Sequence, residues 1–284
     1  MAIRLGCVPE HFSAPLLYAA AHGGLDGVEL VMCKLGTGDM VQRVLAGELD
    51  AAICVTEGLV AGIAKHADRG LRLCGTYVES PLPWAVSIRA DSQLCTLDDL
   101  AFGAAFGISR EGSGSEVMAR YASSQYEWKA PRFVVLGDVD GLVQGVQQGT
   151  VDAFLWERTT MQRHYNAGAV RYLGTVRPPW PAFSLAALAP FAASDRLPQL
   201  ATMLGTATRS FMELPADRRI AFVCDALGYA PDDVQVWLDY VAFADPAAPV
   251  DRASIDKVVA ALRRAGIVGP DVDAAAVVAP ARSS

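Results

Sequence analysis

One segment of this chain occurs twice. VQRVLAGELDAAICVTE begins at Val41 and VQGVQQGTVDAFLWE begins at Val143. The matched pairs are Val41 and Val143, Val44 and Val146, Gly47 and Gly149, Asp50 and Asp152, and Ala51 and Ala153. In each copy a helical pattern ends at a glycine and an apolar strand follows. The order of elements around the copies also repeats, which predicts two lobes built from one duplicated unit. The alternative is a chance match, because a helix that ends at a glycine before an apolar strand is common in α/β proteins.

Strand and helix patterns alternate through residue 190. The first series predicts strands at 2–8, 28–35, 49–55, 71–78 and 81–90, and helices at 16–24, 40–47 and 56–67. The second predicts a short helix start at 96–100, strands at 101–108, 132–136 and 151–156, and helices at 115–124 and 140–149. This alternation is typical of α/β domains with a mainly parallel sheet.

The rest of the chain reads differently. Residues 176–190 are extended and rich in proline, and helical spacing returns at 203–215, 217–228 and 232–244. Trp237, Tyr240 and Phe243 form a stripe that we interpret as core. We therefore expect a helical C-terminal region without catalytic spacing.

The loop GISREGSGSEVM, residues 107–118, leads from a predicted strand into a helix. Ser113 and Glu116 stand at the spacing of a capping box. Free N–H groups and the helix dipole favour an anion at such a helix start. The alternative is that these residues only cap the helix.

Composition excludes several functions. The net charge is −7, and no run of Lys or Arg offers a nucleic-acid surface. No apolar stretch reaches the roughly 18 residues of a membrane span. The six cysteines form no CxxC pair and the four histidines lack ligand spacing, so we expect neither a metal site nor a disulfide framework.

Six strings carry a resemblance to a known family: IRLGCVPEHFSAPLLYA, LAGELDAAI, AVSIRADSQLCTLDDL, FGISREGSGSEVMARY, VDAFLWER and PPWPAF. Together they resemble the nitrate, taurine and alkanesulfonate substrate-binding family, and most closely its intracellular eukaryotic branch, which is related to the thiamine-pyrimidine synthases. The resemblance implies the two-lobed type II periplasmic-binding-protein fold with a hinge. Together with the repeated segment, the resemblance predicts lobe I at 1–90 and 183–284, and lobe II at 91–182.

The resemblance also implies a ligand held between the lobes by loops at the carboxyl ends of strands. Carried over by position, the first lobe offers Glu10, His11, Phe12, Ser13, Thr37, Gly38, Asp39, Thr56 and Glu57, and the return segment offers Trp180. The second lobe offers Ser113, Gly114, Ser115, Trp156, Glu157 and Arg158. We expect Ser113, Gly114 and Ser115 to bind an acidic group, and Arg158 to share that group or to balance Glu157.

Two functions follow from this fold. The first hypothesis is a protein that binds a small anionic or zwitterionic metabolite without chemistry. The alternative is a cytoplasmic enzyme of the same fold, of the thiamine-pyrimidine type or of the chorismate-derived menaquinone type, with acid and base drawn from Glu10, His11, Glu57 and Glu157. The residues favour binding, and we predict no catalytic residue.

Cofactor and location are expected from the same sequence. The thiamine-pyrimidine enzymes use a cleft histidine, a cysteine-rich stretch and pyridoxal phosphate, and this cofactor would need a Schiff-base lysine. In this chain Lys34, Lys65 and Lys129 lie outside the predicted loops. We therefore expect no cofactor. The start MAIRLGCVPEHF lacks the succession of a secretory signal, so we expect a cytoplasmic protein. If a signal peptide was removed, the protein is periplasmic, and only then is a transporter partner expected.

Overall fold

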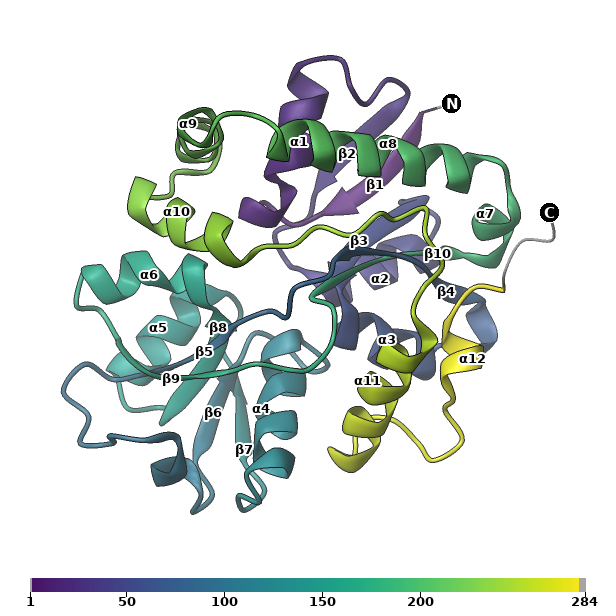
Figure 1. The fold of residues 1–284 in the computed structure, drawn as a ribbon. Coiled ribbons are helices and arrows are strands. Elements are labelled where there is room, and N and C mark those ends of the chain that lie inside the picture. Colours follow the sequence, from purple (N-terminus) through teal and green to yellow (C-terminus); the bar gives the residue numbers. More distant parts are fainter. Residues whose placement is uncertain (1, 281–284) are drawn as a thin grey trace. The chain divides into compact units, whose positions relative to one another are not determined.

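The computed structural model describes residues 2–280, which form two compact units. Within the described residues, unit 1 comprises 2–81, 180–259 and 271–280, and unit 2 comprises Leu82–Pro179 and Ala260–Pro270. Each unit is built on one five-stranded sheet with helices beside it (Figure 1). One helix, α11 (Arg252–Arg264), begins in unit 1 and ends in unit 2.

The unit boundaries differ from the lobe boundaries that the sequence predicts at 90/91 and 182/183. The strand β5 (Trp84–Ile88) belongs to unit 2, because it pairs with two strands of that unit's sheet. Ala182 belongs to unit 1, and its N–H donates to the carbonyl oxygen of Ser80 at 3.3 Å. Backbone pairing thus assigns both connecting segments.

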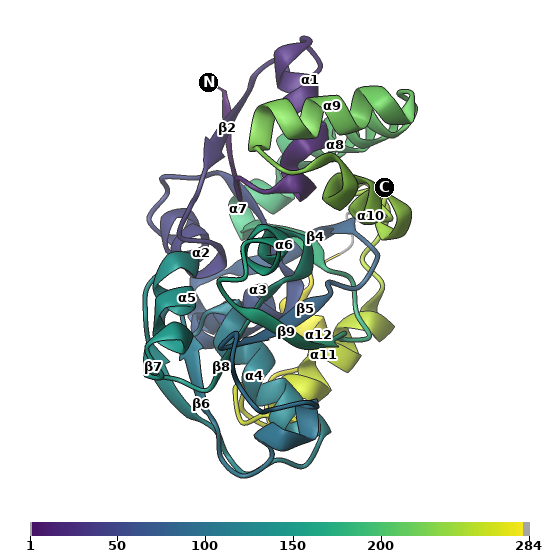
Figure 2. The same ribbon diagram turned by 90° about the vertical axis from the view of Figure 1, so that its left-hand side faces the viewer.

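In unit 1 the strands follow the order β2-β1-β3-β10-β4, and only β10 runs antiparallel to its two neighbours. Helices α1, α8 and α9 pack side by side (Figures 1 and 2). The strands are β1 (Ile3–Cys7), β2 (Val28–Met32), β3 (Ala51–Val55), β4 (Leu71–Val78) and β10 (Phe183–Leu188). The helices are η1 (His11–Ser13), α1 (Ala14–Ala21), α2 (Thr37–Leu45), α3 (Thr56–Lys65), η2 (Ala67–Arg69), α7 (Ala189–Ala193), α8 (Arg196–Met212), α9 (Ala216–Leu227), α10 (Pro231–Tyr240) and α12 (Ala274–Val277).

In unit 2 the order is β7-β6-β8-β5-β9, and here β5 is the antiparallel strand. The other strands are β6 (Ala105–Ile108), β7 (Arg132–Val135), β8 (Ala153–Glu157) and β9 (Arg171–Val176). The helices are η3 (Leu97–Leu100), α4 (Gly114–Gln125), α5 (Val139–Gln147) and α6 (Arg158–Asn166). The two sheets therefore have the same plan.

The repeated sequence explains this shared plan residue by residue. Gly47 and Gly149 each follow a helix with positive φ, 74° and 71°, which a side chain would strain. The carboxylates of Asp50 and Asp152 then accept the backbone N–H of Arg4 at 2.8 Å and of Ala105 at 2.7 Å. Each aspartate thereby ties the turn after its helix to the start of the neighbouring strand.

The strand registers are repeated as well. Gly6 pairs with Ala52 in the sheet of unit 1, here called sheet A, and Gly107 pairs with Phe154 in the sheet of unit 2, called sheet B. A Cβ on Gly6 would stand 2.6 Å from Leu49 Cδ1, and one on Gly107 would stand 2.9 Å from Leu142 Cδ2. Both glycines are needed because apolar side chains lie directly on the strand.

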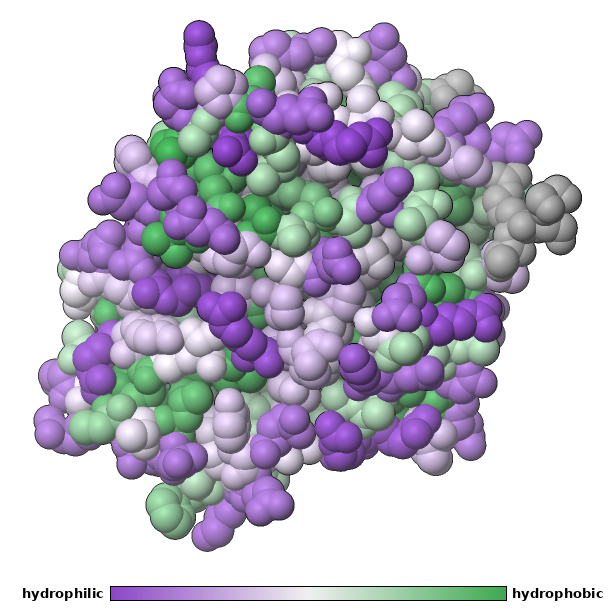
Figure 3. Space-filling model, in the orientation of Figure 1, coloured by the Kyte–Doolittle hydropathy of each residue, from purple (hydrophilic) through white to green (hydrophobic). Residues whose placement is uncertain are grey.

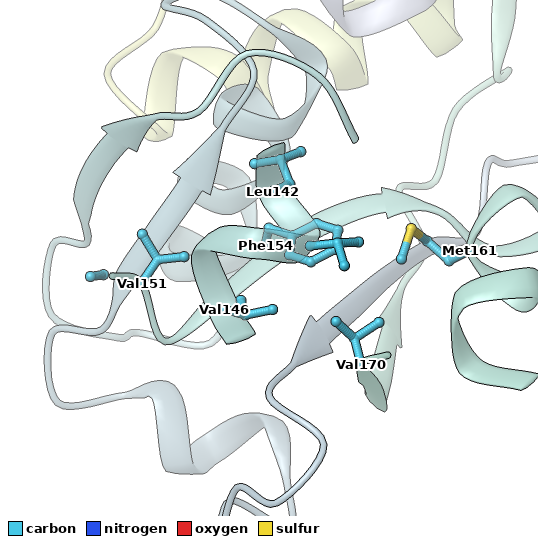
Figure 4. Close-up of a cluster of buried hydrophobic side chains, with 8 residues drawn as sticks. Leu142, Val146, Val151, Phe154, Met161 and Val170 are labelled. Atoms are coloured by element: carbon cyan, nitrogen blue, oxygen red, sulfur yellow. The ribbon is translucent and has the colours of Figure 1, made fainter. Parts of the chain in front are cut away.

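The core of unit 2 shows why its elements pack as they do. Its members come from both sheet and helices and leave Phe154 fully buried in the middle (Figure 4). The cluster consists of Ala105, Leu142, Val143, Val146, Val151, Phe154, Met161 and Val170. It joins α5 and α6 to one face of the sheet.

Several predicted elements are confirmed and others are not. The strand predicted at 71–78 is β4, and the helix predicted at 115–124 is α4. Helix α6 and strand β9 were not predicted. The helix expected at 232–244 ends at Tyr240, so Phe243 lies outside it and forms a bridge with Val78.

The surface carries hydrophilic residues interspersed with apolar ones, as Figure 3 shows for one face. Within residues 2–280, no helix combines the length and hydropathy that a membrane span requires. The most exposed large apolar side chain among the described residues is Phe102, which is 83% exposed.

Candidate functional site

The candidate site residues of unit 1 follow the carboxyl ends of its parallel strands. The first loop after β1 becomes η1, where Ser13 donates its hydroxyl proton to the carbonyl oxygen of Val8 at 2.6 Å. Tyr77 donates to the carbonyl oxygen of Phe12 at 3.0 Å. These two bonds fix the loop that carries Glu10, His11, Phe12 and Ser13.

His11 is completely buried within a cluster of aromatic rings. Its ring centroid lies 4.3 Å from that of Phe12, 4.9 Å from that of Trp237 and 5.1 Å from that of Tyr229. Trp237 belongs to the stripe that we interpreted as core, and it is fully buried. No local signal in the sequence links it or Tyr229 to His11.

The second and third loops of unit 1 lie together. Thr37, which begins α2, is buried, and Gly38 and Asp39 are half-buried in the same turn. A Cβ on Gly58 would stand 2.8 Å from Thr37 Cγ2, so the first turns of α2 and α3 are in close approach. This brings Thr37 beside the first turn of α3, which carries Thr56 and Glu57.

Two buried polar pairs complete this edge of unit 1. The hydroxyls of Thr56 and Ser184 are 2.8 Å apart, and Trp180 donates its indole N–H to Glu57 Oε2 at 3.0 Å. Glu57 is 1% exposed and Trp180 is 2% exposed. Ser184 was missed in the sequence because its partner stands 128 positions away.

Burial also sets the proton affinity of neighbouring groups. It raises the pKa of Tyr77 well above its ordinary value, with a further contribution from Cys7. Burial raises the pKa of Cys7 to about 12. Both groups therefore stay protonated at neutral pH and add no charge to this edge.

In unit 2 the predicted serines stand at the start of α4, directly after β6. Ser113 and Ser115 are each 2% exposed, and their hydroxyl oxygens are 2.9 Å apart. Ser113 Oγ accepts the N–H of Glu116 at 3.4 Å, and Ser115 Oγ accepts the N–H of Ser109 at 3.3 Å. Gly114, the first residue of the helix, is half-buried between them.

The expected capping box forms in a shifted version. Glu116 Oε2 accepts the N–H of Gly112 at 2.7 Å, one residue before the N-cap. Glu116 Oε1 accepts from Arg120 Nε at 2.8 Å. The carboxylate is therefore held on the helix flank, and its charge is balanced there by Arg120.

Glu157 ends β8 and acts as N-cap of α6. Its carboxylate accepts the N–H of Thr159 at 2.9 Å and of Thr160 at 2.6 Å. Because it is 4% exposed, these donors and the helix dipole stabilise a nearly buried charge. Trp156, its neighbour, packs against the apolar cluster on the opposite face of the sheet.

Arg158 lies over aromatic rings. Its guanidinium carbon is 4.7 Å from the ring centre of Tyr172 and 5.2 Å from that of Tyr165, and it donates to Gln162. Burial raises the pKa of Tyr165 to about 12, and its hydroxyl is 2.6 Å from Ser87 Oγ. The tyrosines hold the guanidinium of Arg158, while backbone N–H groups hold Glu157.

Two kinds of site were considered for the described residues, a metal site and a pyridoxal phosphate site. Across residues 2–280, no cluster of three or more His, Cys, Asp or Glu is arranged to hold a metal ion. Lys34, Lys65, Lys129 and Lys257 are all exposed, so these amines do not fit a Schiff base with pyridoxal phosphate in a buried site.

Comparisons with known proteins agree with this architecture. Residues 84–176 match the family model of the Ca3427-like periplasmic binding proteins. The CA3427 protein of Candida albicans is described as having the generic periplasmic-binding-protein fold. It superposes with a TM-score of 0.89 at 27% identity, over 98% of this chain and 96% of that one. No curated protein matches the sequence.

Two bacterial proteins share the fold at lower identity. The aliphatic sulphonate binding protein SsuA of Escherichia coli has a TM-score of 0.72 at 18% identity, over 98% of this chain and 97% of that one. The alkanesulfonate-binding SsuA of Xanthomonas axonopodis, bound to MOPS, has a TM-score of 0.77 at 16% identity, over the same shares of the two chains. The predicted family resemblance and fold class are confirmed.

Proposed function

We propose that this chain, which has the periplasmic-binding-protein fold and a Ca3427-like middle segment, binds a small anionic or zwitterionic molecule and releases it unchanged. The start of α4 is the observation that carries the proposal. Two buried hydroxyls stand there, at the carboxyl edge of sheet B. The first N–H groups of a helix have no acceptor within the helix, and the dipole favours negative charge. An oxyanion suits these donors.

The structural neighbours support an anion as ligand. Both SsuA proteins are named for binding sulfonates, and one is bound to MOPS. A sulfonate or carboxylate accepts several N–H and O–H donors at once, and a charge-assisted hydrogen bond contributes about 1.5–3 kcal/mol. Such local donors act even though the chain has a net charge of −7.

Unit 1 supplies further polar groups that we include in the proposal. Thr37, Gly38, Asp39, Thr56 and Glu57 follow strands of sheet A, as the resemblance implies, and the hydroxyl of Thr56 is already paired. Glu10, His11, Phe12 and Ser13 occupy the first loop of that edge.

Two observations favour binding over catalysis. The carboxylate of Glu157 is engaged by two backbone N–H groups and that of Glu57 by the indole of Trp180. A general base needs a free lone pair directed at its substrate. These carboxylates are used to hold the fold.

The proposal is tested by thermal-shift screening with sulfonates, carboxylates and phosphates, followed by calorimetric titration of the best ligand. Ser115→Ala should weaken binding roughly tenfold, because one hydrogen bond to a charged group is lost. Ser115→Asp should abolish binding by like-charge repulsion. Ser123→Ala is the matched control, because Ser123 is a buried serine of the same helix that donates to the carbonyl oxygen of Ala119 at 2.8 Å.

The outcomes separate a ligand site from a helix cap. Wild-type affinity in Ser123→Ala together with lost affinity in folded Ser115→Asp would support the proposal. If folded Ser115→Asp binds the same anion as tightly as the wild type, these serines only cap α4. Mass spectrometry of the native protein before and after incubation with the ligand checks that it is released unchanged.

A further inference from the structure

Trp84 stands at the start of β5, and within the described residues it shares one property with Trp128 and Trp237. Its side chain is 6% exposed, and its indole Nε1 is buried without a hydrogen-bond acceptor within residues 2–280. A buried N–H group without an acceptor destabilises the folded state, and such groups are rare. The feature therefore calls for a reason.

The strand register places Trp84 at the candidate site of unit 2. Trp84 is paired with Glu157 of β8 on one side and with Val176 of β9 on the other. The N–H of Arg158 donates to the carbonyl oxygen of Pro83 at 3.0 Å, which ties the start of β5 to the start of α6. Trp84 thus lies at the same edge of sheet B as the start of α4.

The face of the sheet is determined by the same register. Phe154 and Trp156 pack with the apolar cluster on the side of α5 and α6. Ala85 is paired with Trp156 and so lies on that same face. Trp84, the residue before Ala85, therefore points to the opposite face, where α4 packs (Figure 1). The indole and the serines of α4 therefore share both an edge and a face.

The carboxylate of its register partner does not accept from the indole. Glu157 accepts from the N–H groups of Thr159 and Thr160. In unit 1, by contrast, the indole N–H of Trp180 donates to Glu57 Oε2 at 3.0 Å. A buried indole N–H of this chain can therefore have a carboxylate as its acceptor, whereas that of Trp84 has none among the described residues.

We propose that the indole N–H of Trp84 is a ligand donor, which donates a hydrogen bond to an oxygen atom of the bound anion. This inference rests on the proposed function and adds a residue that the sequence did not indicate. The ligand completes a hydrogen bond that the free protein lacks, so the donor is worth more in the complex than in the free fold.

The chain provides two matched controls for substitution of tryptophan by phenylalanine. Trp128 also has a buried Nε1 without an acceptor within the described residues, but the N–H of Lys129 beside it bonds to Ala101, at the opposite end of β6. Trp180 has its acceptor in Glu57. Phenylalanine is also what unit 1 carries at the matching register position, where Phe183 is paired with Val55.

The experiment compares Trp84→Phe, Trp128→Phe and Trp180→Phe with the wild type. Calorimetric titration uses three probes, which are MOPS, succinate and inorganic phosphate. For whichever probe binds the wild type most tightly, Trp84→Phe should weaken binding about tenfold to a hundredfold, and Trp128→Phe should leave it within about twofold. Without a probe, Trp84→Phe should change the melting temperature as little as Trp128→Phe does, whereas Trp180→Phe should lower it further.

A spectroscopic readout tests the bond itself. In protein labelled with ¹⁵N at the indole nitrogens, the signal that Trp84→Phe removes should move downfield when the probe is added. The Trp128 signal should stay in place.

Three outcomes would overturn the inference. Trp84→Phe binding the probe with wild-type affinity, or an unmoved Trp84 signal in a saturated complex, would show that the indole does not contact the anion. A melting temperature for probe-free Trp84→Phe as low as that of Trp180→Phe would show an internal acceptor. If no probe binds the wild type, the proposed function itself fails. This result differs from a failure of the Trp84 inference, which requires a probe that binds the wild type and Trp84→Phe equally well.

Discussion

The carboxyl edges of the two sheets share one backbone register but carry different side chains. At matching positions sheet A pairs Val55 with Phe183, and sheet B pairs Glu157 with Trp84. In unit 1 the buried carboxylate comes later, at Glu57, and its partner is Trp180. In unit 2 the carboxylate caps α6, and the indole keeps its N–H free of any described acceptor.

This difference shows which residues hold the duplicated frame and which ones are open to change. Gly6 and Gly107, with Asp50 and Asp152, do the same work in both units. Polar side chains at the strand ends differ because each needs only one partner of suitable chemistry, and the frame offers several. The frame is therefore common, and the chemistry of each edge is its own.

The largest expected effect breaks the polar pair of unit 1. Glu57→Ala leaves the buried indole N–H of Trp180 without its acceptor and should lower the free energy of unfolding by about 2–4 kcal/mol. Glu57→Gln keeps an acceptor oxygen and should lower it by less than about 1.5 kcal/mol. Urea denaturation of both variants measures this. Equal losses would mean that the Trp180 contact is not what Glu57 contributes.

In unit 2 the carboxylate of Glu157 accepts from backbone N–H groups. Other acceptors can replace it there more easily than an acceptor can be found for the buried indole N–H of Trp180. Glu157→Ala should therefore lower the free energy of unfolding by about 1–2 kcal/mol, the usual range for loss of an N-cap. Glu157→Asp, with the side chain of a strong N-cap, should recover about half of that loss. The comparison between the units fails if Glu157→Ala unfolds as easily as Glu57→Ala.

The repeated aspartates should differ by less. Asp50 accepts three hydrogen bonds from Arg4, and Asp152 accepts one from Ala105. Asp50→Ala should therefore cost about 1 kcal/mol more than Asp152→Ala, since the additional bonds are partly exposed. Thermal unfolding of the two single variants and the double variant measures the difference. A reversed order would mean that the Arg4 side chain adds no stability.

Acid should weaken unit 1 through the same aspartate. Burial alone would raise the pKa of Asp50, but hydrogen bonds from Arg4 and its charge outweigh burial and lower that pKa. A carboxyl with a folded pKa below its unfolded value, about 3.9, stabilises the fold above that pH and loses the effect as pH falls through the folded pKa. Asp50→Asn should therefore show a shallower loss of stability below about pH 4 than the wild type. Parallel pH curves for the two proteins would contradict this.

The smallest effect concerns a place where the two copies diverge. Arg43 pairs with Glu48 at 3.1 Å, with side chains 30% and 60% exposed, whereas the matching residue of unit 2 is Gly145. Arg43→Ala should leave the melting temperature almost unchanged, because exposed pairs are screened by water. Glu48→Ala is the control and should behave alike. A clear fall in the melting temperature of both variants would make this pair part of the frame.

Short-range signals in the sequence predicted much of this fold. The alternation of apolar residues located β4, and the spacing of Ser113 and Glu116 located the start of α4. Helix α6 was missed because its sequence, RTTMQRHYN, has little apolar periodicity. Its N-cap is Glu157, which was not recognised as a cap because it directly follows an apolar strand pattern.

By itself, the sequence determined the α/β class, the duplicated frame and the loops that carry polar groups, because periodicity, glycine stops and caps act over a few residues. Only the tertiary structure decided how those groups are paired. Trp180 meets Glu57 across 123 positions, and the indole of Trp84 is buried without a described acceptor. Such pairings depend on strand register and on which face of a sheet a side chain takes, and both are set by packing between segments far apart in the chain.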